Sequence, residues 1–178
     1  TNIGQLYTIK VTDIPFGKLR DKGMPIDNIS NYNSSKEDII TITSQSELNL
    51  YRMLFVTKQS MCKIVNGSEF DVAKRTVAAT KLNEGDEVLS IVILNLQQNI
   101  VFRSKEGYFL RFAIEEIPEK KKNAIGVRGM KMGDKDYLEK VYYTQNGTEN
   151  VIKYKGKKME LNKLKLNKRD SKGTKVRV

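Results

Sequence analysis

"YFLRFAIEEIPEKKKNAIGVRGMKMGDKD", residues 108–136, contains in one run the features that decide the fold. Tyr108, Leu110, Phe112 and Ile114 alternate with other residues, which is the period of two that is typical of a β-strand packed on a core. A proline and three lysines follow, and Gly126 then opens a second short alternation of apolar and basic residues. The stretch therefore predicts a strand, a basic loop, a glycine and a second strand, in that order.

The same order recurs along the chain, which indicates a repeat protein. The apolar residues that end the first strand are spaced by 56, 47 and 47 positions, and they are Ile14, Phe70, Ile117 and Leu164. The glycine position recurs with spacings of 53, 50 and 47, at Gly23, Thr76, Gly126 and Gly173. The stretches that follow it, also predicted as strands, are residues 24–29, 77–82, 127–132 and 174–178. Further apolar runs come next at residues 38–43, 87–94 and 137–143.

Short strands with turns between them, about four in each period of about 47 residues, are typical of propeller blades. We predict an all-β chain, a β-propeller-like pinwheel of about four repeated four-stranded blades. Residues 1–178 form a single repeat domain, with units at roughly 1–48, 49–96, 97–146 and 147–178. The start at Thr1 suggests a piece of a larger subunit. The sequence leaves open whether the blades close into a ring or form an open arc.

The charge balance points to a polyanionic partner. The chain has 32 Lys and Arg against 21 Asp and Glu, a net charge of +11, which favours nucleic acid first and an anionic membrane second. There is no histidine, and Cys62 is the single cysteine. We therefore expect no catalytic residue, no metal site and no independent enzyme. The longest apolar run is too short to span a bilayer, so we expect a soluble, cytoplasmic protein without a membrane partner.

The loop before the glycine position is basic in every unit. One such loop is most simply a solvated surface, but four in register predict a continuous positive band for the backbone of double-stranded DNA, without sequence-specific readout. Gly126 and Gly129 lie between strands rather than helices, so they predict neither a KH-type loop nor a P-loop. The predicted DNA-binding residues are Lys18, Arg20 and Lys22; Lys74 and Arg75; Lys120, Lys121 and Lys122; and Lys168, Arg169 and Lys172.

At these residues the chain resembles the C-terminal β-pinwheel domain found in the A subunits of bacterial DNA gyrase and topoisomerase IV. The resemblance rests on "GQLYTIKVTDIP", "KGMPIDNI", "GDEVLSIVI", "EGYFLRFAIEEIP", "NAIGVRGMKMGDKD" and "TQNGTENVIKY". It implies blades that exchange strands and a basic rim that bends DNA, to support ATP-dependent supercoiling by the whole topoisomerase, an isomerase. It also adds Arg128, Lys131 and Arg177 to the predicted DNA contacts.

The resemblance further implies that this domain holds no cofactor, because ATP and Mg belong to other parts of the parent enzyme. The expected partners, at the bacterial nucleoid, are a second A subunit together with a gyrase B-like subunit. The sequence does not distinguish gyrase from topoisomerase IV. One alternative stays open, a propeller that serves as a protein-interaction platform through a face rather than through the basic rim.

Overall fold

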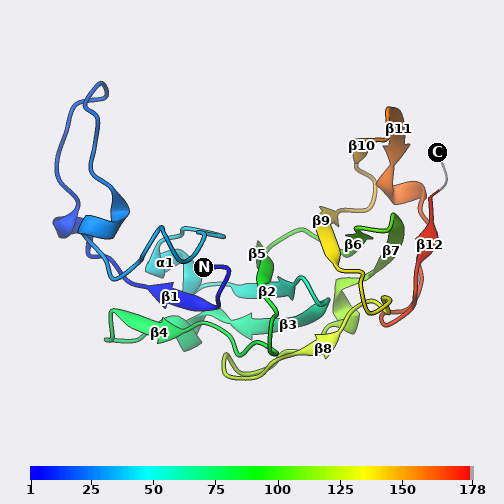
Figure 1. The fold of residues 1–178 in the computed structure, drawn as a ribbon, viewed down its shortest axis with the longest axis horizontal. Helices are drawn as coiled ribbons and strands as arrows, with labels where there is room; N and C mark the ends of the chain where they lie inside the picture. The colour runs from blue at the N-terminus through cyan, green and yellow to red at the C-terminus, as the bar shows by residue number, and fades with distance from the viewer. Residues whose placement is uncertain (177–178) are drawn as a thin grey trace.

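Four successive units of short strands lie along an open arc (Figure 1). The structure is a computed structural model, and it describes residues 1–176. An arm, residues 9–29, projects at one end of the arc, and a hairpin of β10 (Val151–Tyr154) and β11 (Lys157–Glu160) lies at the other. The predicted all-β, pinwheel-like architecture is confirmed.

Two complete four-stranded antiparallel sheets form the centre of the arc. The first has the strand order β5-β2-β3-β8 and the second the equivalent order β9-β6-β7-β12. The strands of the first sheet are β2 (Arg52–Thr57), β3 (Met61–Asn66), β5 (Val88–Leu94) and β8 (Val127–Arg128). Those of the second are β6 (Asn99–Ser104), β7 (Tyr108–Ala113), β9 (Leu138–Thr144) and β12 (Thr174–Lys175).

The second, third and fourth units each give one strand to the unit before them. β8 belongs to the third unit but pairs with β3, and β12 belongs to the fourth but pairs with β7. In the same way β4 (Thr76–Ala78) of the second unit pairs with β1 (Gln5–Tyr7) of the first. The strand exchange that the resemblance implied is therefore present three times, and it links the units in sequence order.

A short 3₁₀ helix follows the strand that accepts this pairing in the first three units, and an equivalent one follows β11 in the fourth. These helices begin at residues spaced by 56, 47 and 47, the spacing predicted for the strand ends, and they are η1 (Val11–Asp13), η3 (Gly67–Phe70), η4 (Ile114–Glu116) and η5 (Leu161–Lys163). The remaining helices are η2 (Ile26–Asn28) and the single turn α1 (Gln45–Leu48), whose first turn is capped by the Ser44 side chain. Each unit thus has a 3₁₀ helix at residues that the sequence pattern assigned to the end of the preceding strand.

The recurrent glycine lets the exchanged strand approach its acceptor closely. Gly126 has a φ of 109°, and a Cβ atom there would lie 2.6 Å from the carbonyl oxygen of Cys62 in β3. Gly173 has a φ of 80°, and its Cβ would lie 2.6 Å from the carbonyl oxygen of Phe109 in β7. Both positions therefore exclude a side chain through backbone conformation and through backbone contact.

The inner strands are buried on both faces because neighbouring sheets pack against each other. Leu54 and Val56 of β2 share a core with Phe102 of the next sheet, whereas Met53 and Phe55 belong to a second core on the opposite face. Within the first core, Phe102 and Phe112 meet edge to face, with ring centroids 5.2 Å apart. These stacked cores hold the units in the relative positions that align their loops.

Two predictions for the first unit are wrong. Residues 24–29 contain η2 instead of a strand, and residues 38–43 form no strand. By its place in the repeat, the stretch 24–29 corresponds to β4, β8 and β12, each of which pairs with the unit before it. The described residues 1–176 contain no such acceptor for the first unit. Phe16 and Leu19 of the arm are accordingly fully exposed.

Candidate nucleic-acid interface

The predicted basic residues lie in or beside four loops that follow the 3₁₀ helix of each unit. Most of their side chains are exposed to solvent: Lys18, Arg20, Lys22, Lys74, Arg75, Lys121, Arg128, Lys131, Lys168 and Lys172. Lys120, Lys122 and Arg169 are half-buried, and Arg177 lies outside the described residues. The loops of the second, third and fourth units follow one another along the arc (Figure 1). The loop of the first unit, which contains Lys18, Arg20 and Lys22, is part of the arm.

Two of these residues, Lys122 and Arg169, join neighbouring units by donating two hydrogen bonds to a glutamate of the unit before, in the same way at both junctions. The Lys122 amide donates to the Glu69 carboxylate at 2.9 Å, and the Lys122 ammonium donates to the Glu69 carbonyl oxygen at 2.8 Å. In the next unit, the Arg169 amide donates to the Glu116 carboxylate at 2.9 Å, and its guanidinium donates to the Glu116 carbonyl oxygen at 3.1 Å. Lys122 and Arg169 are therefore partly committed to holding the arc together.

A third junction uses a variant of this contact. Asp13 occupies the position of Glu69 and Glu116 in the 3₁₀ helix of the first unit, and its carboxylate lies 3.3 Å from the Arg75 guanidinium. An exposed pair of this kind contributes little stability, about 0–1 kcal/mol. With this pair, all three junctions have an acidic group of one unit in contact with the basic loop of the next.

Arg128 and Lys172 also have partners within the protein. The Arg128 Nε lies 2.6 Å from Asp170, a hydrogen bond that, with the positive charge of Arg128, lowers the pKa of the Asp170 carboxyl. The Lys172 ammonium lies over the Tyr108 ring, 5.2 Å from its centroid. Both side chains remain exposed at the surface, so they can still exchange these partners for a phosphate.

Lys63, which the sequence patterns did not single out, is the buried basic residue of this region. It lies in β3, and its ammonium donates to three carbonyl oxygens of the loop that contains Lys120–Lys122. Burial lowers its pKa to about 8, and the nearby Glu69 carboxylate acts in the opposite direction. An alternating strand pattern assigns such a lysine to a solvated face, so only the packing of the next unit against β3 reveals it.

The acidic turns of the repeat are used inside their own units. The Asp86 carboxylate accepts from the Gln59 amide at 2.9 Å, and the Asp136 carboxylate accepts from the Glu106 amide at 3.0 Å, at equivalent places. These carboxylates close turns next to the strands rather than neutralise the basic loops. In residues 1–176, Lys18, Lys74, Lys120, Lys131 and Lys168 have no carboxylate within 4.0 Å of the ammonium.

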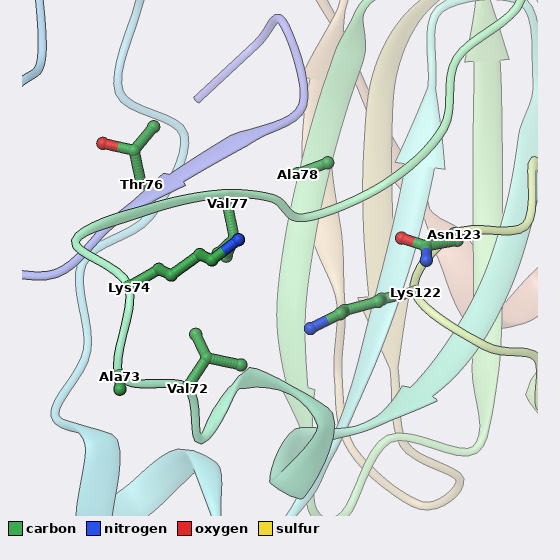
Figure 2. Close-up of a pocket in the computed structure, with 8 residues that line it drawn as sticks. All are labelled: Val72, Ala73, Lys74, Thr76, Val77, Ala78, Lys122 and Asn123. Atoms are coloured by element: carbon green, nitrogen blue, oxygen red, sulfur yellow. The ribbon is translucent and has the colours of Figure 1, made fainter.

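Two neighbouring basic loops face each other across a shallow hollow of about 600 Å³. Lys74 of the second unit and Lys122 of the third extend into it from opposite sides, above Val72 and Ala73 (Figure 2). The hollow lies where β4 leaves its own unit for the sheet of the first. It therefore brings positive charge from two successive units to one place on the surface.

Within the described part of the chain there is no group of three or more His, Cys, Asp or Glu side chains that could hold a metal ion. Over the same residues, none of the helices combines the length and the apolar character that crossing a bilayer requires.

The sequence matches the family described as "DNA gyrase C-terminal domain, beta-propeller" at residues 52–95, 98–145 and 155–177, more than half of the chain. The DNA gyrase A protein of Helicobacter pylori (strain ATCC 700392 / 26695) is 29% identical over 140 residues, which are 78% of this chain and 17% of that protein. The DNA gyrase A protein of Chlamydia pneumoniae is 30% identical over 153 residues, 84% of this chain and 18% of that protein. The chain thus spans less than a fifth of the length of these curated relatives.

Solved structures share the fold. The C-terminal domain of DNA topoisomerase IV superimposes with a TM-score of 0.85 at 24% identity, over 97% of this chain and 55% of that one. The DNA gyrase A C-terminal domain superimposes with a TM-score of 0.71 at 24% identity, over 97% of this chain and 57% of that one. The pinwheel assignment therefore rests on structure as well as on sequence.

Proposed function

The chain belongs to the family of DNA gyrase C-terminal β-propeller domains, and from this membership we propose that it binds and bends duplex DNA as the non-catalytic domain of a type IIA topoisomerase. It supports supercoiling by holding DNA against the basic loops while the rest of the parent enzyme uses ATP and Mg. Through that parent it works with a second A subunit, together with a gyrase B-like subunit, in the bacterial cytoplasm.

One observation carries this proposal: the same basic loop recurs at the same place in four successive units. Its exposed ammonium groups include Lys18, Lys74, Lys121 and Lys168. The carboxylates at the junctions and turns bind backbone amides, as for Glu69 and Asp136. Glu69 also lies 3.5 Å from the exposed Lys121 ammonium. The exposed basic groups of the four loops therefore form a repeated row on a chain of net charge +11, which suits a phosphate backbone and needs no reading of base edges.

The number of phosphate contacts that four loops can make is compatible with the free energy needed to bend DNA. Smooth bending of a site of 20–30 base pairs costs about 1–6 kcal/mol, which phosphate contacts must offset. If each of the four loops neutralises one or two phosphates, the slope of log K against log salt is roughly −4 to −7. Affinity then falls roughly 10²- to 10⁴-fold between 50 and 200 mM salt.

The test is a comparison of dissociation constants for duplexes of about 10 and about 40 base pairs, at two salt concentrations. We expect tighter, strongly salt-dependent binding of the longer duplex. Replacing Lys120 and Lys121 together by glutamine should weaken binding and reduce the salt slope. The matched control replaces Lys135 and Lys140, two exposed lysines outside the four loops.

Equal binding of both duplexes would contradict bending, and equal effects of the two double variants would contradict the loops as the binding surface. Absence of DNA binding would transfer the function to protein contacts. In that case the exposed apolar residues of the arm, such as Phe16 and Leu19, become the surface to test.

A further inference from the structure

Lys63 places a positive charge inside the protein, directly beneath one basic loop. The residue is 1% exposed. Its ammonium lies 3.2 Å from the carbonyl oxygen of Lys121, 2.6 Å from that of Lys122 and 2.6 Å from that of Ala124. An ammonium group has three N–H donors, so these three carbonyl groups satisfy it completely. The hydrogen-bonding capacity of Lys63 is thus directed at the backbone of a single loop.

The amides of the same loop are held by the same unit. The Lys120 amide donates to the Ile64 carbonyl oxygen at 2.8 Å, and the Lys122 amide donates to the Glu69 carboxylate at 2.9 Å. Residues 120–124 are therefore fixed through amides and carbonyl groups at once. Above this backbone the Lys121 side chain is 85% exposed, and its ammonium lies 3.5 Å from the Glu69 carboxylate, which a phosphate can replace as its partner. A fixed backbone thus carries an exposed positive charge.

The fourth unit provides an internal comparison. The 47-residue spacing between η3 and η4 places Leu110 at the position of Lys63. The equivalent loop keeps its amide contacts, since the Asn167 amide donates to the Arg111 carbonyl oxygen at 2.9 Å and the Arg169 amide donates to Glu116. Leu110, however, has no donor for the carbonyl groups of that loop. The buried ammonium is therefore a property of the 120–124 loop and not of the repeat as a whole.

We propose that Lys63 is a positioning residue for DNA binding, which holds residues 120–124 so that Lys120 and Lys121 meet the duplex without reorganisation. This inference rests on the proposed function, because it names how one loop of that surface is prepared. Lys63 cannot contact DNA itself while it is 1% exposed. A loop that is fixed before binding loses less backbone entropy when it binds.

The first measurement needs no DNA. Hydrogen exchange is followed at the amides of Lys120 and Lys122, with Asn167 and Arg169 as their equivalents in the fourth unit. In Lys63→Met we expect exchange at the first two amides to accelerate at least tenfold, with little change at the other two. Lys63→Leu, which introduces the residue found at the equivalent position 110, should behave in the same way. It replaces Lys63→Met in the experiment if the methionine variant does not fold.

The second measurement is a double-mutant cycle on DNA affinity with the duplex of about 40 base pairs. The cycle compares the native chain, Lys63→Met, the double variant Lys120→Gln and Lys121→Gln, and the triple variant. We expect Lys63→Met to weaken binding about as much as the double variant does. It should also reduce the salt slope by about 1 to 2, the contribution of one or two phosphates. In the triple variant Lys63→Met should have no further effect.

Each outcome decides a separate question. Unchanged exchange at Lys120 and Lys122 would overturn the positioning role, whether or not DNA binds. Faster exchange with unchanged affinity and salt slope would show that Lys63 serves the fold alone, and additive effects in the triple variant would do the same. If the native chain binds no DNA, the proposed function fails, and the positioning of the loop for DNA fails with it.

Discussion

Replacing Gly126 by alanine should detach the exchanged strand β8 from β3. The φ of Gly126 is 109°, and the new methyl group would lie 2.6 Å from the Cys62 carbonyl oxygen and 3.0 Å from its carbonyl carbon. Both atoms belong to backbone in the middle of a sheet, so neither can move aside as a flexible side chain would. β8 has two residues and pairs with β3 at two positions, so a small displacement removes much of its pairing.

The expected loss of stability can be built from its parts. A non-glycine residue at positive φ costs roughly 1–2 kcal/mol, and forcing extra volume into a packed site adds roughly 1–3 kcal/mol. Alanine also lowers the conformational entropy of the unfolded chain, which offsets about 0.4–1 kcal/mol of this loss. The free energy of unfolding should therefore fall by about 1–5 kcal/mol.

Gly23 is the matched control for this change. It has a φ of 73°, but nothing lies within 4 Å of a Cβ built on it, so Gly23→Ala should lose only about 0–1.6 kcal/mol, from conformation alone. Urea unfolding gives both values, and exchange at the Gly129 amide, which donates to the Ser60 carbonyl oxygen at 2.7 Å, reports on β8 directly. Equal losses in the two variants, with unchanged exchange at Gly129, would refute close approach as the reason for the glycine.

Two substitutions and one titration test the junctions between units. Glu116→Ala removes the acceptor of the Arg169 amide and should destabilise the fourth unit by about 1–3 kcal/mol, which urea unfolding measures; an unchanged free energy of unfolding would contradict this. The pKa of Asp170 is lowered by Arg128, so this group stabilises the fold above its unfolded pKa of about 3.9, and the contribution is lost as pH falls through the lower folded value. Arg128→Gln should therefore reduce the dependence of the free energy of unfolding on pH below about 4. An unchanged dependence in the variant would contradict a stabilising pair of Arg128 and Asp170. The pKa of Lys63 is lowered to about 8, so the unfolded chain binds more protons from there to about 10.4, and this group makes the free energy of unfolding rise with pH across that window. An NMR titration of the Lys63 ε-carbon should have its midpoint near 8, whereas a midpoint above 10 would mean that the three carbonyl groups outweigh burial.

Much of the repeat could be predicted from the sequence because its signals are local. Alternating apolar residues marked β3 and β7, and the recurrence of Gly126 and Gly173 marked where the exchanged strands begin. The first unit could not be predicted in this way. Residues 24–29 resemble the exchanged strands of the other units, but a strand requires a partner, and pairing is not a property of the stretch itself.

The basic residues divide into groups that local sequence does not separate. Lys121 and Lys122 are adjacent in one run of lysines and both contact Glu69. The Lys121 side chain is nevertheless 85% exposed, whereas the half-buried Lys122 binds Glu69 through both its amide and its ammonium. A signal for this was present, because Asp13, Glu69 and Glu116 recur at one phase of the repeat and each contacts the basic loop of the next unit. Lys63 gave no such signal, because its burial depends on a loop nearly 60 residues away.

Positive charge is also found on the arm and on the hairpin of β10 and β11. An exposed edge strand and an arm built like an exchanged strand invite head-to-tail addition of copies. The β11 edge carries exposed Lys157 and Lys158, and the arm carries exposed Lys18, Arg20 and Lys22. The fourth unit, moreover, has Lys163 at the position that is acidic in the other three. Addition of the arm to β11 of another copy would bring like charges together and would lack the acidic partner found at every junction along the arc. The charge that suits a phosphate backbone therefore also opposes pairing of the arm with β11 between two copies of this chain.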